Sequence, residues 1–170
     1  TEHLIDQGCQ QIALLSGPEH LLTSRRRIDG YRAALQRHHR PIVDEWIIPL
    51  PFSPEESLAV TRELLSRPHR PDGIFAASDA IALGSHAAIN ELGLSMPQEI
   101  ALIGFADLPI ASLLNPPLSS VAEPTFEMGQ TAANLLINMI KNPGGQMPSV
   151  GNVLKTKLMV RRSSQRRPHR

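Results

Sequence analysis

The sequence predicts a three-layer α/β fold built on a mainly parallel sheet. Short apolar segments, such as 73–77 and 101–105, are bounded by Gly or Asp, as expected of strands that are buried on both faces. Longer segments with apolar residues at helical spacing alternate with them, which is typical of a parallel sheet covered by helices. With 170 residues, 41% of them hydrophobic, the chain can form one sizeable core.

The first third of the chain contains two strand–helix pairs after the end of a helix. Gly8 closes the initial helical segment, because glycine readily adopts the conformation that ends helices. The sequence Ser-Pro-Glu-Glu at 53–56 is a typical helix start, with a capping Ser, an early Pro and acids in the first turn. The expected elements are a helix end at 1–8, strands at 11–15 and 46–50, and helices at 25–38 and 54–67.

The central part of the chain forms a strand–helix–strand unit. Ser78 and Asp79 begin its helix and Gly93 ends it. A unit of this length is a right-handed parallel crossover. Ser78, Asp79 and Asp107 should therefore gather at the carboxyl ends of neighbouring strands, where open α/β sheets bind ligands. The expected elements are a strand at 73–77, a helix at 80–92 and a strand at 101–105.

The last third of the chain continues the alternation less regularly. A helix begins at Pro124, and the sequence Asn-Pro-Gly-Gly at 142–145 ends it. The segment 161–170 is rich in arginine and has no apolar periodicity, so we expect it to form a solvated basic tail. The expected elements are a short helix at 110–114, an extended segment at 118–121, a helix at 124–140 and a strand at 153–160.

Four short motifs follow one another between residues 78 and 121. They are Ser-Asp-Ala-Ile-Ala-Leu-Gly at 78–84, Met-Pro-Gln-Glu-Ile at 96–100, Gly-Phe-Ala-Asp at 104–107 and Pro-Pro-Leu-Ser-Ser-Val at 116–121. In this order and spacing they resemble the effector-binding domain of the lactose-repressor (LacI/GalR) family of bacterial transcription regulators. The resemblance covers nearly the whole chain and implies the periplasmic-binding-protein-like type I fold, in which two subdomains face each other across a ligand cleft.

The resemblance also implies a domain organisation. The expected parts are the C-terminal subdomain at 1–121, a crossover helix of the other subdomain within 122–152, a return strand at 153–162 and the basic tail at 163–170. Most of the other subdomain would lie outside the chain, so the crossover helix would lose much of its packing partner. The chain begins within a helix and reads as a fragment, and a DNA-binding headpiece is expected outside it.

The expected ligand is a sugar or a related small metabolite. By resemblance, Thr23, Arg27 and Phe52 match positions that contact the effector. The guanidinium of Arg27 offers a planar fork of donors for hydroxyls or a carboxylate, and the ring of Phe52 suits the apolar face of a sugar. The candidate effector contacts are Thr23, Arg27, Phe52, Ser78, Asp79, Asp107 and Glu123.

Other roles stay open for several of these residues. Ala106 stands where the family commonly has an Asp that contacts the ligand, so either the effector carries fewer hydroxyls than a hexose or the site has drifted. Arg27 could belong to a solvated helical turn, and Phe52 could be a core residue. Asp79 could act only on the helix dipole, and Asp107 could only start the next short helix.

The family resemblance further implies a homodimer formed through the C-terminal subdomain. The exposed face of the helix at 80–92, together with the short helix at 110–114, would form the interface. The candidate interface residues are Ile81, Leu83, Ala88, Ile110, Leu113 and Leu114.

Composition and motifs argue against several functions. A net charge of +1 gives no electrostatic case for nucleic-acid binding by this chain, and no apolar run approaches the ~20 residues of a membrane span. The single cysteine, Cys9, allows no internal disulfide and fits a reducing compartment. There is no P-loop, nucleophile elbow or dinucleotide-binding motif, and the seven histidines lack metal-ligand spacing. We therefore expect no catalytic residue, metal or cofactor.

These observations predict the effector-sensing domain of a LacI-type regulator that acts in the cytoplasm, with operator DNA bound only through the headpiece. A periplasmic sugar-binding protein of a transport system shares the fold, and a secretory signal upstream would identify it. A small α/β enzyme would show activity in a hydrolase or transferase screen. A truncated remnant with impaired ligand binding is a further alternative.

Overall fold

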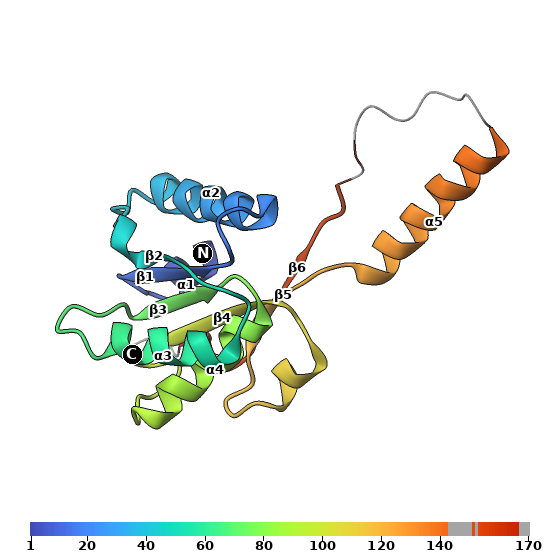
Figure 1. The fold of residues 1–170 in the computed structure, drawn as a ribbon. Coiled ribbons are helices and arrows are strands. Elements are labelled where there is room, and N and C mark those ends of the chain that lie inside the picture. Colours follow the sequence, from blue (N-terminus) through green and yellow to red (C-terminus); the bar gives the residue numbers. More distant parts are fainter. Residues whose placement is uncertain (143–150, 152, 167–170) are drawn as a thin grey trace.

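Six strands form one sheet in the computed structural model, which describes residues 1–142, 151 and 153–166. Their order across the sheet is β2-β1-β3-β4-β5-β6, and every neighbouring pair is parallel except β5 and β6 (Figure 1). The strands are β1 (Ile12–Ser16), β2 (Ile47–Pro49), β3 (Gly73–Ala76), β4 (Ala101–Ala106), β5 (Ser119–Ala122) and β6 (Lys157–Met159). The predicted mainly parallel sheet is confirmed.

Helices cover both faces of this sheet. The α-helices are α1 (Glu2–Asp6), α2 (Leu22–Arg37), α3 (Pro54–Leu65), α4 (Asp79–Glu91) and α5 (Thr125–Lys141), and the 3₁₀ helices are η1 (Asp44–Trp46) and η2 (Pro109–Leu113). Figure 1 shows α2 over one face and α3 and α4 over the other. The three-layer prediction is therefore confirmed.

Alternating side chains of the strands supply the two cores. On β3, Ile74 points to the face covered by α3 and α4, where it joins Leu64 and Ile81. Its neighbour Phe75 points to the opposite face, where it joins Tyr31 of α2. Because successive side chains of a strand point to opposite faces, a continuous apolar run is what a sheet covered on both faces requires.

The predicted helix boundaries follow from local capping. The hydroxyls of Ser53 and Ser78 accept hydrogen bonds from the backbone N–H groups at the starts of α3 and α4, both at 3.2 Å. Gly8 and Gly93 have φ values of 86° and 67°, in the region that glycine adopts without steric cost. The largest difference at a predicted helix start is that of α2, which begins at Leu22, three residues before the expected position.

The predicted exposed face of α4 is wrong for two residues. Ile81 and Ala88 are fully buried, because α4 packs against the sheet on one side and α3 on the other. A hydrogen bond of 3.0 Å between the hydroxyls of Thr61 and Ser85 joins the two helices. Neither Ile81 nor Ala88 can therefore reach a partner subunit. The other candidate interface residues differ in exposure: Leu83 and Leu114 are half-buried, and Ile110 and Leu113 are exposed.

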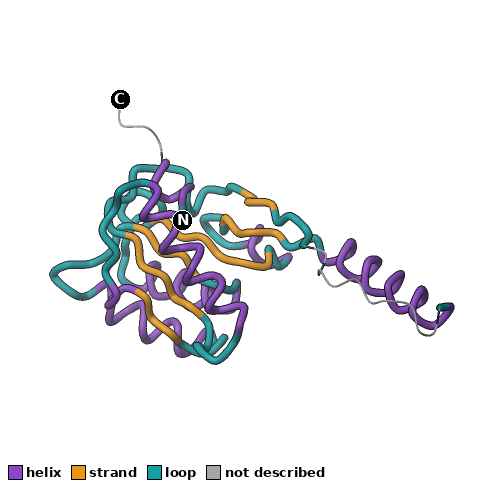
Figure 2. The backbone as a smooth tube through the Cα atoms, turned by 90° about the horizontal axis from the view of Figure 1, so that it is seen from above, coloured by secondary structure: helices purple, strands orange, loops and turns teal. Residues whose placement is uncertain are grey.

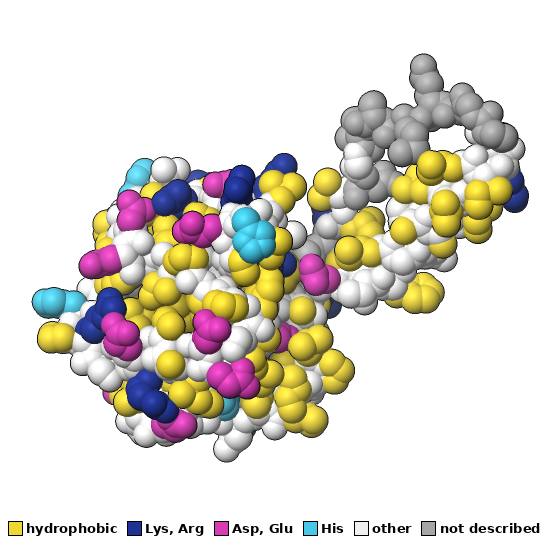
Figure 3. All heavy atoms as spheres, in the orientation of Figure 1, with side chains coloured by type: hydrophobic (Ala, Val, Ile, Leu, Met, Phe, Trp, Pro, Cys, Tyr) yellow, Lys and Arg dark blue, Asp and Glu magenta, His cyan; other side chains and the backbone are white. Residues whose placement is uncertain are grey.

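Helix α5 projects away from the rest of the protein. Figure 1 and Figure 2 show it beyond the end of β5, to which it is connected by residues 123 and 124. None of its residues is buried, and Figure 3 shows many of its hydrophobic side chains at the surface. This agrees with the expectation that the helix lacks its packing partner. The predicted stop spans 142–145: Asn142 is the C-cap of α5, and 143–145 lie outside the described residues.

The segment after β6 is not the solvated tail that the sequence predicts. Ser163 and Ser164 are fully buried. The hydroxyl of Ser163 donates to the carbonyl of Leu102 at 2.7 Å and accepts from the backbone N–H of Ser119 at 2.8 Å. Small hydroxyl side chains can enter such a site because every polar atom finds a partner. The tail prediction is therefore wrong for Arg161, Ser163, Ser164 and Arg166, whereas Arg162 and Gln165 are exposed. Residues 167–170 lie outside the described residues.

Candidate functional site

The carboxyl ends of the parallel strands form one edge of the sheet. Leu15 of β1 pairs with Ala76 of β3, Phe75 of β3 with Ile103 of β4, and Ala106 of β4 with Ala122 of β5. This register places the turns after β1, β3 and β4 side by side, as predicted. The candidate effector contacts come from the segments that follow β2, β3, β4 and β5 and from the first turns of α2.

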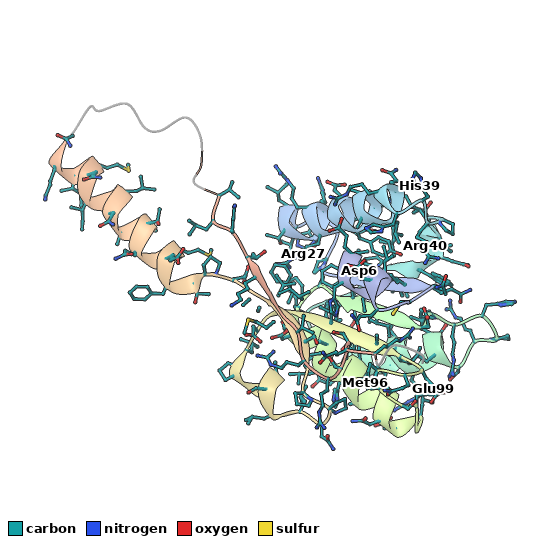
Figure 4. The ribbon with its side chains drawn as sticks, turned by 180° about the vertical axis from the view of Figure 1, so that it is seen from behind. Asp6, Arg27, His39, Arg40, Met96 and Glu99 are labelled. Atoms are coloured by element: carbon teal, nitrogen blue, oxygen red, sulfur yellow. The ribbon has the colours of Figure 1, made fainter. Side chains whose placement is uncertain are left out.

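Arg27 of α2 is held in place on this edge. One nitrogen, Nη1, donates to the carbonyl of Ala77 at 2.9 Å, and the guanidinium carbon lies 3.9 Å from the ring centroid of Phe105. The latter contact is a cation–π interaction. Figure 4 labels Arg27 below α2, on the side of the body from which the chain leaves for α5.

The guanidinium of Arg27 retains hydrogen-bonding capacity. Its side chain is only 18% exposed, and Nη2 lies 3.9 Å from Oε1 of Glu123, which is too far for a hydrogen bond. Burial lowers the pKa of Arg27, and the negative charge of Glu123 acts in the opposite direction. Among the described residues, Nε and Nη2 have no hydrogen-bond acceptor. A largely buried guanidinium with free N–H groups is suited to a ligand that accepts hydrogen bonds.

Asp79 does not face the open edge as the sequence predicts. The residue is 1% exposed, and both carboxylate oxygens accept hydrogen bonds from the protein. Oδ2 accepts from the backbone N–H of Leu108 at 2.6 Å, and Oδ1 accepts from the hydroxyl of Ser120 at 2.7 Å. Asp79 therefore ties the start of α4 to the turn after β4 and to β5.

The turn after β4 has an unusual backbone. Ala106 and Asp107 have φ values of 116° and 54°. Positive φ costs residues with a side chain about 1–2 kcal/mol each. The conformation is supported by Ser120, whose hydroxyl accepts from the backbone N–H of Asp107 at 3.0 Å. The side chain of Asp107 pairs with Arg161, with Nη1 and Oδ1 2.6 Å apart. Asp107 lies on the predicted edge, but one of its oxygens is already used.

Sequence reasoning missed Arg161 as part of this edge. It lies 54 residues from Asp107 in the chain, among the arginines of the expected tail. No local pattern distinguishes it from its neighbours Arg162 and Arg166. Only the return of the chain beside β5 brings it to the turn.

The remaining predicted contacts lie around the same edge. Thr23 is exposed in the first turn of α2, and Ser78 is half-buried as the N-cap of α4. Phe52 is 41% exposed, and its ring packs against Gly17, where an added β-carbon would overlap two ring carbons. Phe52 is therefore a surface residue of the edge rather than a core residue. Ser24, which the sequence did not single out, is fully buried beside Gly17, and its hydroxyl has no partner in the described part of the chain.

Two cavities lie apart from most of the predicted contacts. One, of about 380 Å³, lies between α5 and the returning segment and is lined by Glu123, Met128 and Leu154 among others. The other, of about 600 Å³, lies before β4 and β5, at the opposite end of the sheet, and is lined by Pro97, Asn115 and Arg162 among others. Of the predicted contacts, Glu123 alone lines one of these two cavities.

Neither an activated thiol nor a cluster of metal-ligating side chains is present among the described residues. Burial raises the pKa of the Cys9 thiol to about 12, which disfavours the reactive thiolate. Residues 1–142, 151 and 153–166 contain no group of three or more His, Cys, Asp or Glu side chains arranged to hold a metal ion. Across the same residues, no helix combines the length and apolar character needed to cross a membrane.

Known proteins share this sequence and fold. The family model described as "Periplasmic binding protein-like domain" matches residues 1–164. The ribose operon repressor of Escherichia coli K12 is 38% identical over 143 residues, which are 84% of this chain and 43% of the repressor. The chain thus spans less than half the length of this curated relative.

Solved structures of transcriptional regulators share this fold. The complex of the transcriptional regulator CelR with cellobiose has a TM-score of 0.87 and 34% identity, with 95% of this chain and 49% of that chain covered. A sugar-binding LacI-family regulator from Escherichia coli, complexed with phosphate, has a TM-score of 0.84 and 33% identity, covering 95% and 57% respectively. The resemblance to LacI-type regulators is confirmed, and the chain belongs to the periplasmic binding protein-like domain family.

Proposed function

We propose that the chain is the effector-sensing part of a LacI-type transcriptional regulator whose effector is a sugar or a related small metabolite. The observation that carries this proposal is Arg27, whose guanidinium is fixed by Ala77 and Phe105 while two of its nitrogens lack an acceptor within the described residues. The cellobiose and phosphate complexes of the similar regulators support a small ligand that accepts hydrogen bonds.

The effector would bind at the carboxyl edge, between this body and the rest of the sensing domain. We assign 1–121 to one subdomain, 122–152 to the segment that crosses to the other, and 153–162 to the return. Effector binding would favour one relative orientation of the two subdomains, and a DNA-binding headpiece outside this chain would respond to it. The domain would act without enzymatic activity, in the cytoplasm.

The protein would function as a homodimer. Leu108, Ile110 and Leu113 of the η2 region are 45%, 41% and 77% exposed. Figure 3 shows hydrophobic side chains gathered over this part of the surface. An exposed apolar patch of this kind is typical of a subunit interface.

The decisive test of effector binding uses the native gene product. Its intact mass and N-terminal sequence come first: a helix-turn-helix supports a regulator, and a cleaved secretory signal would instead identify a periplasmic transport protein. Calorimetric titration with ribose, cellobiose and inorganic phosphate then tests for the effector class. Binding of none of these would contradict the proposed ligand class.

Replacing Arg27 by Gln should weaken binding of whichever of these compounds the protein binds. The loss should be about tenfold or more, because hydrogen bonds from a charged donor contribute about 1.5–3 kcal/mol. Arg32→Gln is the matched control, since Arg32 lies on the same helix with a half-exposed side chain paired to Asp44 at 2.8 Å. Equal affinities in the two variants would place the effector away from Arg27.

A further inference from the structure

Arg161 reaches the turn after β4 from the far end of the chain. Its Nη1 donates to Oδ1 of Asp107 at 2.6 Å and to the carbonyl of Leu118 at 2.7 Å. The side chains of Arg161 and Asp107 are 21% and 16% exposed, so water screens their attraction only in part. Arg161 lies just after β6, in the segment by which the chain comes back from α5 (Figure 1). The ion pair therefore joins the candidate effector edge to the returning segment.

The turn is held from two directions. From the body, Asp79 accepts from the backbone N–H of Leu108, and Ser120 accepts from the backbone N–H of Asp107. These bonds fix the backbone, while Arg161 fixes the side chain of Asp107. Because Ala106 and Asp107 both have positive φ, the turn is expected to relax when this support is removed.

We propose that Arg161 is a positioning residue of the effector site. Through Asp107 it keeps the turn at 106–108 in the conformation that faces the effector, and it makes effector affinity depend on where the returning segment lies. The link to the effector rests on the proposed function, whereas the positioning of the turn rests on the geometry alone.

The same segment contains a matched control. Arg166 pairs with Asp72 at 3.1 Å, and the two side chains are 16% and 31% exposed. Its Nε also donates to the carbonyl of Pro97 at 3.0 Å, at the opposite end of the sheet from the effector edge. Removing either arginine thus deletes a comparable half-buried ion pair of the C-terminal segment, but only Arg161 contacts the turn.

Amide hydrogen exchange in the native gene product, without ligand, tests the positioning role. In Arg161→Met the amides of Asp107 and Leu108 should exchange about tenfold faster than in the wild type. This increase is counted after correction for the change in the free energy of unfolding. Arg161→Lys should restore most of the protection, because it keeps the charge. Arg166→Met should change exchange only as far as it changes the free energy of unfolding, measured with urea. Equal exchange rates of these two amides in Arg161→Met and Arg166→Met would overturn the proposal. If Arg161→Met folds poorly, Arg161→Lys provides the test.

Titration with ribose tests the link to the effector. Arg161→Met should weaken ribose binding about tenfold, Arg161→Lys should recover most of it, and Arg166→Met should bind as the wild type does. Unchanged ribose affinity in a variant whose turn exchanges faster would overturn the link. If the wild type binds neither ribose, cellobiose nor phosphate, the proposed function fails, and the exchange data still decide whether Arg161 positions the turn.

Discussion

Asp79 and Arg27 lie at the same edge of the sheet but differ in the hydrogen-bonding groups that they have left for a ligand. Both carboxylate oxygens of Asp79 accept hydrogen bonds within the protein, from Leu108 and Ser120. Arg27 has one hydrogen bond to Ala77, and its other nitrogens have no acceptor among the described residues. Proximity to the edge is therefore not sufficient for a ligand contact. The deciding quantity is how many donors or acceptors each side chain has left.

His86 should make stability depend on pH. Burial lowers the pKa of His86 from its ordinary value of 6.5, against the opposing effect of its hydrogen bond to the carbonyl of Pro116. In the unfolded chain the imidazole binds a proton near its ordinary pKa, so below that pH protonation favours unfolding. The free energy of unfolding should fall as the pH drops from about 7 to about 5.5, and less steeply in His86→Gln.

Urea unfolding of the two proteins at several pH values measures this difference. Some dependence should persist in His86→Gln, since burial also lowers the pKa of His3. Identical slopes for the wild type and the variant would show that His86 does not contribute.

At the level of elements, capping and packing act together. Ser53 and Ser78 fix where α3 and α4 begin, and Gly84 lets the two helices approach closely. A β-carbon at Gly84 would overlap the carbonyl oxygen of Pro54 and the hydroxyl of Ser57. By contrast, α5 has a cap without a side-chain hydrogen bond and no buried residue, so it gains little stability from packing within the described residues.

Gly84→Ala should destabilise the protein by about 1–3 kcal/mol, because the added methyl group forces α3 and α4 apart. Gly30→Ala is the matched control: Gly30 lies inside α2 with no atom within 4 Å of an added β-carbon. There the change should stabilise by about 0.5–1 kcal/mol, since alanine favours the helix. Both values follow from urea unfolding. A Gly84→Ala variant as stable as Gly30→Ala would contradict the close packing.

At the scale of the whole molecule, the body and α5 differ in how they are stabilised. The body has two apolar cores, one on each face of the sheet, and the C-terminal segment is bound back to it through Ser163 and Arg166. Helix α5 exposes large apolar side chains, including Phe126 at 81% and Ile140 at 70%. This arrangement matches a chain that spans about half the length of its regulator relatives.

Leu113→Glu should weaken the proposed homodimer of the native gene product. A charge placed on this exposed apolar patch must lose water when a partner covers it, and the dimer dissociation constant should rise at least about tenfold. Leu22→Glu is the control, because Leu22 is 65% exposed on α2, away from η2. Sedimentation velocity over a range of concentrations measures both. A dimer that withstands Leu113→Glu would have to use another surface.

The sequence by itself determined the order of the elements, the parallel sheet, the helix caps and the edge where strand ends meet. These features depend on local signals, such as the apolar runs at β3 and β4 and the capping residues Ser53 and Ser78. Residues distant in the chain determined the rest. Packing of α4 between the sheet and α3 buried Ile81 and Ala88, and hydrogen bonds from Leu108 and Ser120 used both oxygens of Asp79.

The role of Arg161 is the clearest case of what only the tertiary structure decided. Its pairing with Asp107 requires the chain to leave the sheet after β5, pass through α5 and return as β6. Contacts of this kind depend on which segments lie side by side in space, and local sequence patterns carry no information about them.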